Sequence, residues 1–261
     1  MKTLAPHKQD FFNNIANEFD SHIENSIPLF KEFRNNLVYN IANKYNEANI
    51  IDICGSTAKL GRELLKENFK GSYTCLDGSI QMKKVFENTT SKNDKKKINF
   101  IQGGFLASWI ENFEGETFNV QQYNANEKQF DISIEIVGFQ FFTKERKKEV
   151  QEMKRISKTC IFFEKFNNKD VNLYAKNEVL KNTLHKSKVF SQKEIENKQK
   201  NVLNDMHNFC YDNENFVHLL KENFKYVRKI FKAGNFEGFM CSDSPIQYNI
   251  DSDLINNKFN A

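Results

Sequence analysis

The segment NIIDICGSTAKLGRELL, residues 49–65, decides how the rest of the chain is interpreted. It opens with NIIDIC, a short apolar run rich in β-branched residues and typical of a buried parallel strand. Small residues follow at 54–58, and a helical pattern continues through Leu65. A strand, a small-residue turn and a helix in this order begin many nucleotide-binding units, but a purely structural corner has the same pattern.

The pattern of a strand followed by a helix recurs along the chain. Further strands are predicted at 72–77, 96–104, within 130–142 and at 158–166. This alternation indicates an α/β fold with a parallel, doubly wound sheet and right-handed crossovers. After a helix at 213–223, residues 225–243 are predicted to form two strands joined at Gly234-Asn235. So short a connection requires these two strands to pair antiparallel.

Four segments lie outside this alternation. Residues 8–47 have helical spacing, with Ser26 as the expected cap and Pro28 in the first turn of a second helix. A polar insertion is expected at 109–129, and a Lys/Asn-rich helical insertion at 167–211. The polar tail, 244–261, is expected to be frayed.

The composition argues against several classes of protein. The 261 residues are 39% hydrophobic with only 10 Gly and 3 Pro, which disfavours a turn-rich sandwich. The net charge of +4 is spread along the chain, so direct binding of nucleic acid is not expected. No stretch approaches the ~20 apolar residues of a membrane span. We therefore expect a soluble, cytoplasmic protein without membrane contact.

The cysteines point to the same compartment. None of the 5 forms a C-x-x-C pair, and no Cys/His cluster has zinc-ligand spacing, so no metal site is expected. Cys54, Cys75 and Cys160 lie in apolar, strand-like runs, as buried thiols do in a reducing cytoplasm.

Acidic and small residues gather at the ends of the first predicted strands. Asp52 belongs to the end of the first strand, and the loop after it stays small, so that a ligand can approach the backbone at a helix N-terminus. Asp77 closes the second strand, where an acid accepts hydrogen bonds from ribose hydroxyls. The alternative is that Asp77 or Ser79 caps the next helix.

Five alternating units that end in an antiparallel hairpin resemble the class I S-adenosylmethionine-dependent methyltransferases. The resemblance implies a Rossmann-like, mostly parallel seven-stranded sheet with an antiparallel terminal strand, a helical N-terminal segment and a helical insertion. It also implies S-adenosylmethionine as cofactor and S-adenosylhomocysteine as product. That family has glycines where this chain has Cys54, Ser56 and Ala58, and an acid where it has Gly104.

Four further segments resemble the carboxy-S-adenosylmethionine synthase-like family. They are FDSHIENSIPLFKEF (19–33), FQFFTKER (139–146), FFEKF (162–166) and FSQKEIENKQKNVLNDM (190–206), in the same order along residues 16–242. The resemblance implies four parts: an N-terminal helical lid at 1–47, a cofactor-binding core at 48–166 and 212–243, an insertion at 167–211 for the acceptor or a dimer contact, and a flexible tail at 244–261. It also implies a homodimer formed through the region around 185–218.

The same resemblance assigns candidate site residues. The cofactor-binding set it implies is Phe30, Asp52, Cys54, Gly55, Ser56, Asp77, Gly78, Gly104 and Phe105. Substrate contacts are assigned to Gln140, His185 and His218. Phe30 stands where the family has a tyrosine, and His218 where it has an arginine that holds the carboxylate of the carboxylated cofactor.

Three functions follow as hypotheses. The first is methyl transfer to a small-molecule acceptor, which needs alignment more than a catalytic residue because the sulfonium methyl is already activated. No catalytic residue is assigned. The second is a carboxy-S-adenosylmethionine synthase-like role in modifying the wobble uridine of tRNA. The third is a non-catalytic binding or structural protein with the same fold.

Overall fold

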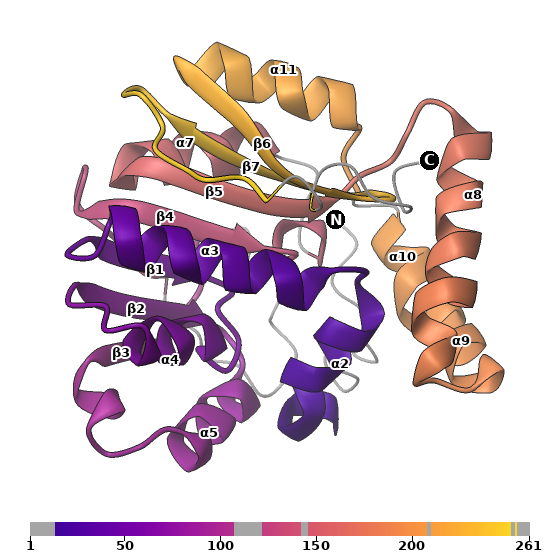
Figure 1. Ribbon diagram of the computed structural model, residues 1–261, viewed down its shortest axis with the longest axis horizontal. Coiled ribbons are helices and arrows are strands. Elements are labelled where there is room, and N and C mark those ends of the chain that lie inside the picture. Colours follow the sequence, from indigo (N-terminus) through magenta and orange to yellow (C-terminus); the bar gives the residue numbers. More distant parts are fainter. Residues whose placement is uncertain (1–13, 107–121, 142–145, 208–209, 252–253, 255–261) are drawn as a thin grey trace.

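A seven-stranded sheet forms the centre of the protein (Figure 1). The computed structural model describes residues 14–106, 122–141, 146–207, 210–251 and 254. The strand order is β3-β2-β1-β4-β5-β7-β6. The strands are β1 (Asn49–Ile53), β2 (Ser72–Asp77), β3 (Ile98–Gln102), β4 (Phe130–Ile136), β5 (Ser157–Lys165), β6 (Tyr226–Ala233) and β7 (Phe236–Ser242).

The direction of the strands confirms the predicted Rossmann-like fold. The first five strands pair parallel, whereas β7 pairs antiparallel with both β5 and β6. The connection between β6 and β7 is Gly234-Asn235, as predicted, and Gly234 has the positive φ of 59° that favours glycine. Parallel strands β1, β2 and β4 therefore end at one edge of the sheet, where ligands bind in such folds.

Helices cover both faces of the sheet (Figure 1). The helices are η1 (Ala16–Glu18), α2 (Phe19–Ser26), α3 (Phe30–Lys44), α4 (Lys59–Lys66), α5 (Ile80–Thr89), η2 (Asp94–Lys96), η3 (Phe139–Phe141), α7 (Arg146–Ile156), α8 (Val171–Leu180), η4 (Lys181–His185), η5 (Lys186–Lys188), α9 (Gln192–Lys198), η6 (Gln199–Leu203), α10 (Asn204–His207) and α11 (Asn213–Asn223). One hydrophobic cluster joins α3 and α4 to the sheet, and a second joins α7 and α11 to it. The two clusters are separate layers of the core.

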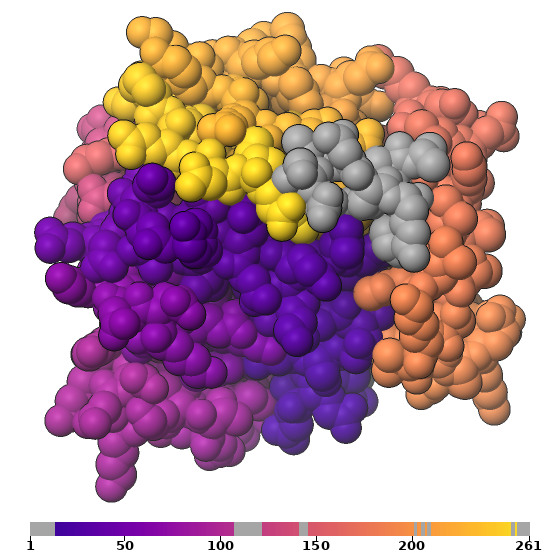
Figure 2. Space-filling model, viewed as in Figure 1, coloured from indigo at the N-terminus to yellow at the C-terminus, as the bar shows by residue number. Residues whose placement is uncertain are grey.

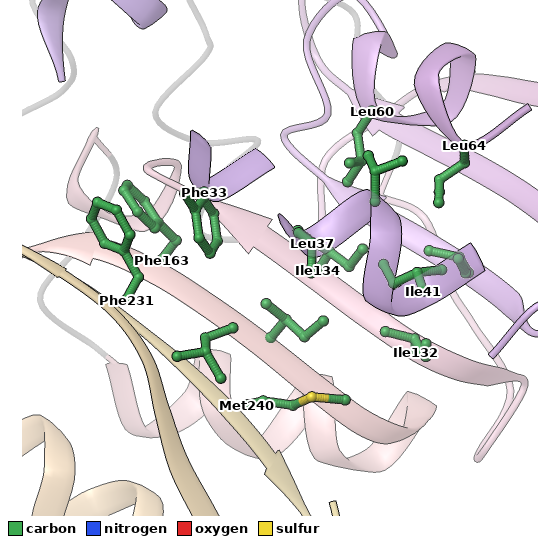
Figure 3. Close-up of a cluster of buried hydrophobic side chains, with 14 of the residues drawn as sticks. Phe33, Leu37, Ile41, Leu60, Leu64, Ile132, Ile134, Phe163, Phe231 and Met240 are labelled. Atoms are coloured by element: carbon green, nitrogen blue, oxygen red, sulfur yellow. The ribbon is translucent and has the colours of Figure 1, made fainter. Parts of the chain in front are cut away.

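Aromatic packing fixes α3 against the sheet (Figure 3). Phe33, Leu37 and Ile41 come from successive turns of α3 and are 0%, 0% and 1% exposed. The Phe33 ring stacks on Phe163 of β5 with centroids 4.6 Å apart and meets Phe231 of β6 at 5.1 Å. Rings in such arrangements add to the free energy gained by burial, which explains why so much of the core is phenylalanine.

The N-terminal helices begin differently from the prediction. Ser26 does not cap a second helix, because it is the last residue of α2. Leu29, with a left-handed φ of 57°, precedes α3, which starts at Phe30 without a side-chain cap. Pro28 therefore lies in the turn between the two helices, and residues 1–13 lie outside the described part of the chain.

The tail also departs from the prediction in its described part. Tyr248 is 4% exposed and Leu254 is 2% exposed, and both belong to the cluster under α3. The backbone N–H of Asn249 donates to Oδ1 of Asn40 at 2.6 Å. The apolar side chains in a polar stretch hold residues 244–251 against α3, so the expected flexible tail is packed there.

The insertion after β5 is helical, as predicted. Helix α8 continues into η4, a π-helical turn, and a second π-helical turn, η6, follows α9. Figure 1 shows α8–α10 beyond the end of the sheet where β5 ends. The expected polar insertion at 109–129 falls mostly on residues outside the described ones, which resume at 122. Within the described part of the chain, no helix has the length and apolar character to cross a membrane.

Candidate functional site

The loop after β1 has the backbone of a glycine-rich loop without the glycines. Cys54, Ser56 and Ala58 have φ angles of 59°, 51° and 56°. These are the positions where the resemblance expects glycine, and each non-glycine residue in this region costs about 1–2 kcal/mol. The loop therefore keeps a strained conformation that such residues do not adopt for local reasons.

Gly55 is needed for space rather than for its backbone angles. A Cβ at this position would lie 2.7 Å from Cys75 Sγ and 2.9 Å from Asp52 Cγ. Asp52 is 3% exposed, and the Tyr73 hydroxyl donates to its Oδ2. Burial, with a smaller contribution from Asp77, raises the pKa of Asp52 to about 7 despite that hydrogen bond. The buried Asp52 side chain thus packs directly against Gly55 of the loop.

Asp77 at the end of β2 binds the loop from the other side. Its Oδ2 accepts from the Ser56 N–H at 3.0 Å, and its Oδ1 accepts from the Ser79 N–H at 2.8 Å. A carboxylate has about four lone-pair sites, so two remain for ribose hydroxyls. Ser79 caps α5 by accepting from the Met82 N–H at 3.2 Å. Burial raises the pKa of Asp77 to about 6.

The predicted adenine contacts lie at the end of β3. Gly104 forms an isolated bridge with Gln122, and its carbonyl accepts from the Tyr123 N–H at 2.8 Å. Phe105 is 1% exposed and lies parallel to Phe139, with ring centroids 6.3 Å apart. The structure therefore places Gly104 at the ligand edge, whereas the Phe105 ring is part of the core.

Phe30 is also a core residue. It is 4% exposed, meets the Phe163 ring edge-on at 5.6 Å and lies under the guanidinium of Arg34 at 5.8 Å. It shares a hydrophobic cluster with Ala58 of the loop, and no contact with Asp77 is seen among the described residues. Its assignment as a cofactor contact stays a prediction.

Two buried carboxyl groups shape the turn after β4. Glu135 accepts from the N–H groups of Gly138 and Phe139, and Glu164 Oε1 accepts from Phe139 N–H at 3.0 Å. Burial and the neighbouring Glu164 raise the pKa of Glu135 well above its ordinary value. This turn holds Gln140, which is 0% exposed and donates to the Val137 carbonyl at 3.2 Å. Glu135 could not be recognised in the sequence, because a buried carboxyl group within a strand leaves no signal in the residue pattern.

The two histidines assigned to the substrate, His185 and His218, have different surroundings. His185 Nε2 is 3.2 Å from the Glu24 carbonyl, so it joins the insertion to α2. His218 is 75% exposed on α11 and lies 3.2 Å from Glu222. The structure thus brings His185 to α2 and leaves His218 on the surface.

Helix α2 reaches the loop directly. The Thr57 hydroxyl donates to Asp20 Oδ1 at 2.6 Å, and Arg62 Nη2 pairs with Asp20 Oδ2 at 3.1 Å. The loop is therefore held between Asp77 of β2 and Asp20 of α2. Together with Gly78, these groups form a polar, small-residue surface at the carboxyl edge of the sheet, which suits a nucleoside.

Another depression lies at the opposite edge of the sheet. It has a volume of about 640 Å³ and is lined by residues that include Tyr45, Asp131 and Lys158. Parallel strands begin there, so it is not the site described above. Among the described residues no group of His, Cys, Asp and Glu is arranged to hold a metal ion.

Comparison with known proteins identifies the family. The model of the ubiE/COQ5 methyltransferase family matches residues 2–159. The chain belongs to this methyltransferase family. The match covers the N-terminal helices and the sheet into β5, and the family implies S-adenosylmethionine as cofactor. The helical insertion and the hairpin lie beyond it. Comparison with curated proteins gave no match.

Solved structures show the same fold at low sequence identity. A putative S-adenosylmethionine-dependent methyltransferase from Methanococcus maripaludis is 18% identical, with 95% of this chain and 97% of that chain covered and a TM-score of 0.52. A Haloferax volcanii structure, a complex of the Trm112 methyltransferase activator and a putative methyltransferase, matches at 12% identity, 89% and 97% coverage and a TM-score of 0.55. An O-methyltransferase family protein from Burkholderia thailandensis is 12% identical with a TM-score of 0.55, and the match covers 90% of this chain but 59% of that one.

The residues of the site fit this cofactor at the ribose. Asp77 retains acceptor capacity beside a loop whose backbone is drawn close by small side chains. The Cys54 side chain packs against Gly138, because a Cβ added at Gly138 would lie 2.9 Å from the Cβ of Cys54. Cys54 therefore fills space that a glycine at position 54 would leave open. The fit is therefore best at the nucleoside end of the site.

Proposed function

We propose that the protein transfers a methyl group from S-adenosylmethionine to a small-molecule acceptor. The observation that carries the proposal is the left-handed backbone at 54, 56 and 58 beside Asp77. A chain that had lost its ligand would have no reason to retain three strained non-glycine residues at the edge where ligands bind. Family membership supports the same cofactor.

The roles of the residues follow from their positions. Asp77 would accept hydrogen bonds from the ribose hydroxyls, and the 54–56 backbone and Gly78 would approach the rest of the cofactor. When bound, the cofactor supplies an activated methyl group. The chain then has to align the acceptor and exclude water. Asp20 of α2 contributes by holding the lid helix on the loop.

The acceptor would be bound by the parts outside the family match. The turn at 137–140 and the helical insertion lie near the ends of β4 and β5. The carboxylated-cofactor alternative gains no support from His218, because this residue is exposed and paired with Glu222. The non-catalytic alternative is decided by cofactor binding, and the dimer stays a prediction.

Calorimetric titration with S-adenosylhomocysteine tests the proposal. Asp77→Ala removes the ribose acceptor and should weaken binding by about tenfold or more, the effect of losing hydrogen bonds to a charged group. Glu87→Ala, at an exposed position of α5, is the matched control and should leave binding unchanged. Mass spectrometry of ligand released from the purified protein gives an independent identification of the cofactor.

The outcomes separate the hypotheses. Binding by the native chain and by Glu87→Ala, with loss in Asp77→Ala, supports the proposed site. The absence of binding by the native chain at millimolar ligand would leave only the non-catalytic alternative. A carboxylated cofactor in the released ligand would favour the second hypothesis instead.

A further inference from the structure

Buried lysine side chains gather where the helical insertion meets α2 and the end of β5. Lys165, Lys181 and Lys186 are 2%, 4% and 2% exposed, and Lys198 at the end of α9 is half-buried. We call these residues the lysine cluster. Lysine is almost never fully buried unless its charge is paired. The pairing of each ammonium group therefore shows whether the protein's own side chains balance the buried charge.

Glu178 of α8 is the carboxylate that pairs with two members of the cluster. Its Oε2 lies 3.0 Å from Lys165 Nζ and also contacts Lys181 Nζ. Burial, the largest single effect, lowers the pKa of Lys165, but the charges of Glu178 and other neighbours, with the hydrogen bond to Tyr174, together raise it. The pKa of Lys181 is lowered well below its ordinary value by burial and by the charge of Lys165. One carboxylate thus serves two ammonium groups.

Lys186 has no such partner. Within the described residues its ammonium has neither a hydrogen-bond acceptor nor an ion pair, although the side chain is 2% exposed. Burial, followed by repulsion from Lys198, lowers the pKa of Lys186 to about 7. A buried, unpaired ammonium is costly and persists in proteins when it serves a ligand or a reaction. Lys186 follows the π-helical turn Lys181–His185, a feature often found at functional sites.

Lys198 connects the cluster to the lid helix. Its Nζ donates to Ser26 Oγ at 2.8 Å and contacts Nε2 of His22. Burial and then the Lys198 charge lower the pKa of His22 to about 4, so the imidazole is neutral and can accept this hydrogen bond. Burial, together with repulsion from Lys181 and Lys165, lowers the pKa of Lys198 to about 7.

Helix α2 joins the lysine cluster to the loop after β1. Lys165 directly follows Glu164, which shapes the turn after β4, and the helix that contacts Lys198 also contacts Thr57 in the loop. Figure 1 shows α2 and the insertion beyond the same end of the sheet, and in Figure 2 the indigo and orange surfaces meet. A group bound at the cluster would therefore lie on the acceptor side of the site.

We propose that the lysine cluster binds an oxyanion, and that this oxyanion is a phosphate group carried by the methyl acceptor. Lys186 and Lys198 would be its principal ligands. Lysine is a compact point charge suited to phosphate oxygens, whereas a planar carboxylate is better matched by the arginine fork. The link to an acceptor rests on the proposed methyltransferase function, and the anion site does not.

Calorimetry with inorganic phosphate, acetate and chloride at low ionic strength tests the proposal. The native chain should bind phosphate, and Lys186→Met should weaken that binding by at least about tenfold, the effect of losing a charge-assisted hydrogen bond. Lys188→Met is the matched control, because Lys188 belongs to the same turn and is exposed. S-adenosylhomocysteine is titrated against all three proteins.

Thermal unfolding shows that Lys186→Met is folded and adds a second readout. Since methionine removes a buried charge that has no partner among the described residues, the variant should melt no lower than the native chain. Phosphate should raise the melting temperature of the native chain and of Lys188→Met, but not that of Lys186→Met. A lower melting temperature without phosphate would show that Lys186 is structural and overturn the proposal.

The results separate this inference from the proposed function. Cofactor binding without phosphate binding, or equal phosphate binding by Lys186→Met and Lys188→Met, overturns the anion site alone. Acetate that binds as tightly as phosphate overturns the phosphate assignment. Phosphate binding with the expected variant effect but without cofactor binding supports the anion site and contradicts the methyltransferase function.

Discussion

At the scale of single residues, the loop after β1 contains an unusual exchange of glycine for small side chains. The three left-handed residues are Cys54, Ser56 and Ala58, while Gly55 between them is fixed by lack of space. The sequence showed that the residues are small. Their φ angles could not be predicted, because non-glycine residues rarely adopt this region and tertiary contacts such as the bond from Ser56 N–H to Asp77 impose it.

Strain in the loop gives a prediction for Ser56. Ser56→Gly should raise the free energy of unfolding by about 1 kcal/mol, because glycine adopts a φ of 51° without steric cost. Ser56→Ala is the control, since it removes the same hydroxyl but keeps the Cβ, and it should not stabilise. Chemical denaturation of both variants measures the difference. Equal stabilities would mean that the loop is unstrained at this residue.

At the scale of elements, α2 contacts both the loop after β1 and the lysine cluster. Asp20 bonds Thr57 and Arg62, and Ser26 bonds Lys198. The helical character of this segment was predictable from its apolar spacing. The end of α2 at Ser26 was not, because the start of α3 depends on the left-handed Leu29 rather than on a capping side chain.

The contacts of α2 with the loop give a prediction for Asp20. Asp20→Ala should weaken binding of S-adenosylhomocysteine several-fold, about 1 kcal/mol, because α2 loses its polar contacts with the loop. Glu18→Ala, an exposed change in the preceding turn, should leave the affinity as it is. Calorimetry measures the affinities, and limited proteolysis should show faster cleavage near α2 in Asp20→Ala alone. Unchanged affinity with faster cleavage would mean that the helix does not cover the cofactor.

At the scale of the whole molecule, the sheet could be predicted from the sequence, whereas the cofactor site and the lysine cluster could be predicted only in part. Alternating strands and helices, with a final hairpin that has a two-residue turn, determined the strand directions. Asp77 could be placed because the end of a strand is readable. The lysine cluster could not, because lysine is common throughout the chain and nothing in its local pattern distinguishes the buried Lys186 from the exposed Lys188.

A crystal structure of the protein grown with S-adenosylhomocysteine is the most direct test of the cofactor site. We predict that the ligand lies over residues 54–58, with its ribose hydroxyls within hydrogen-bond distance, about 3 Å, of the Asp77 carboxylate. A ligand bound elsewhere, or an Asp77 carboxylate that contacts only Ser56 and Ser79 beside bound ligand, would contradict it.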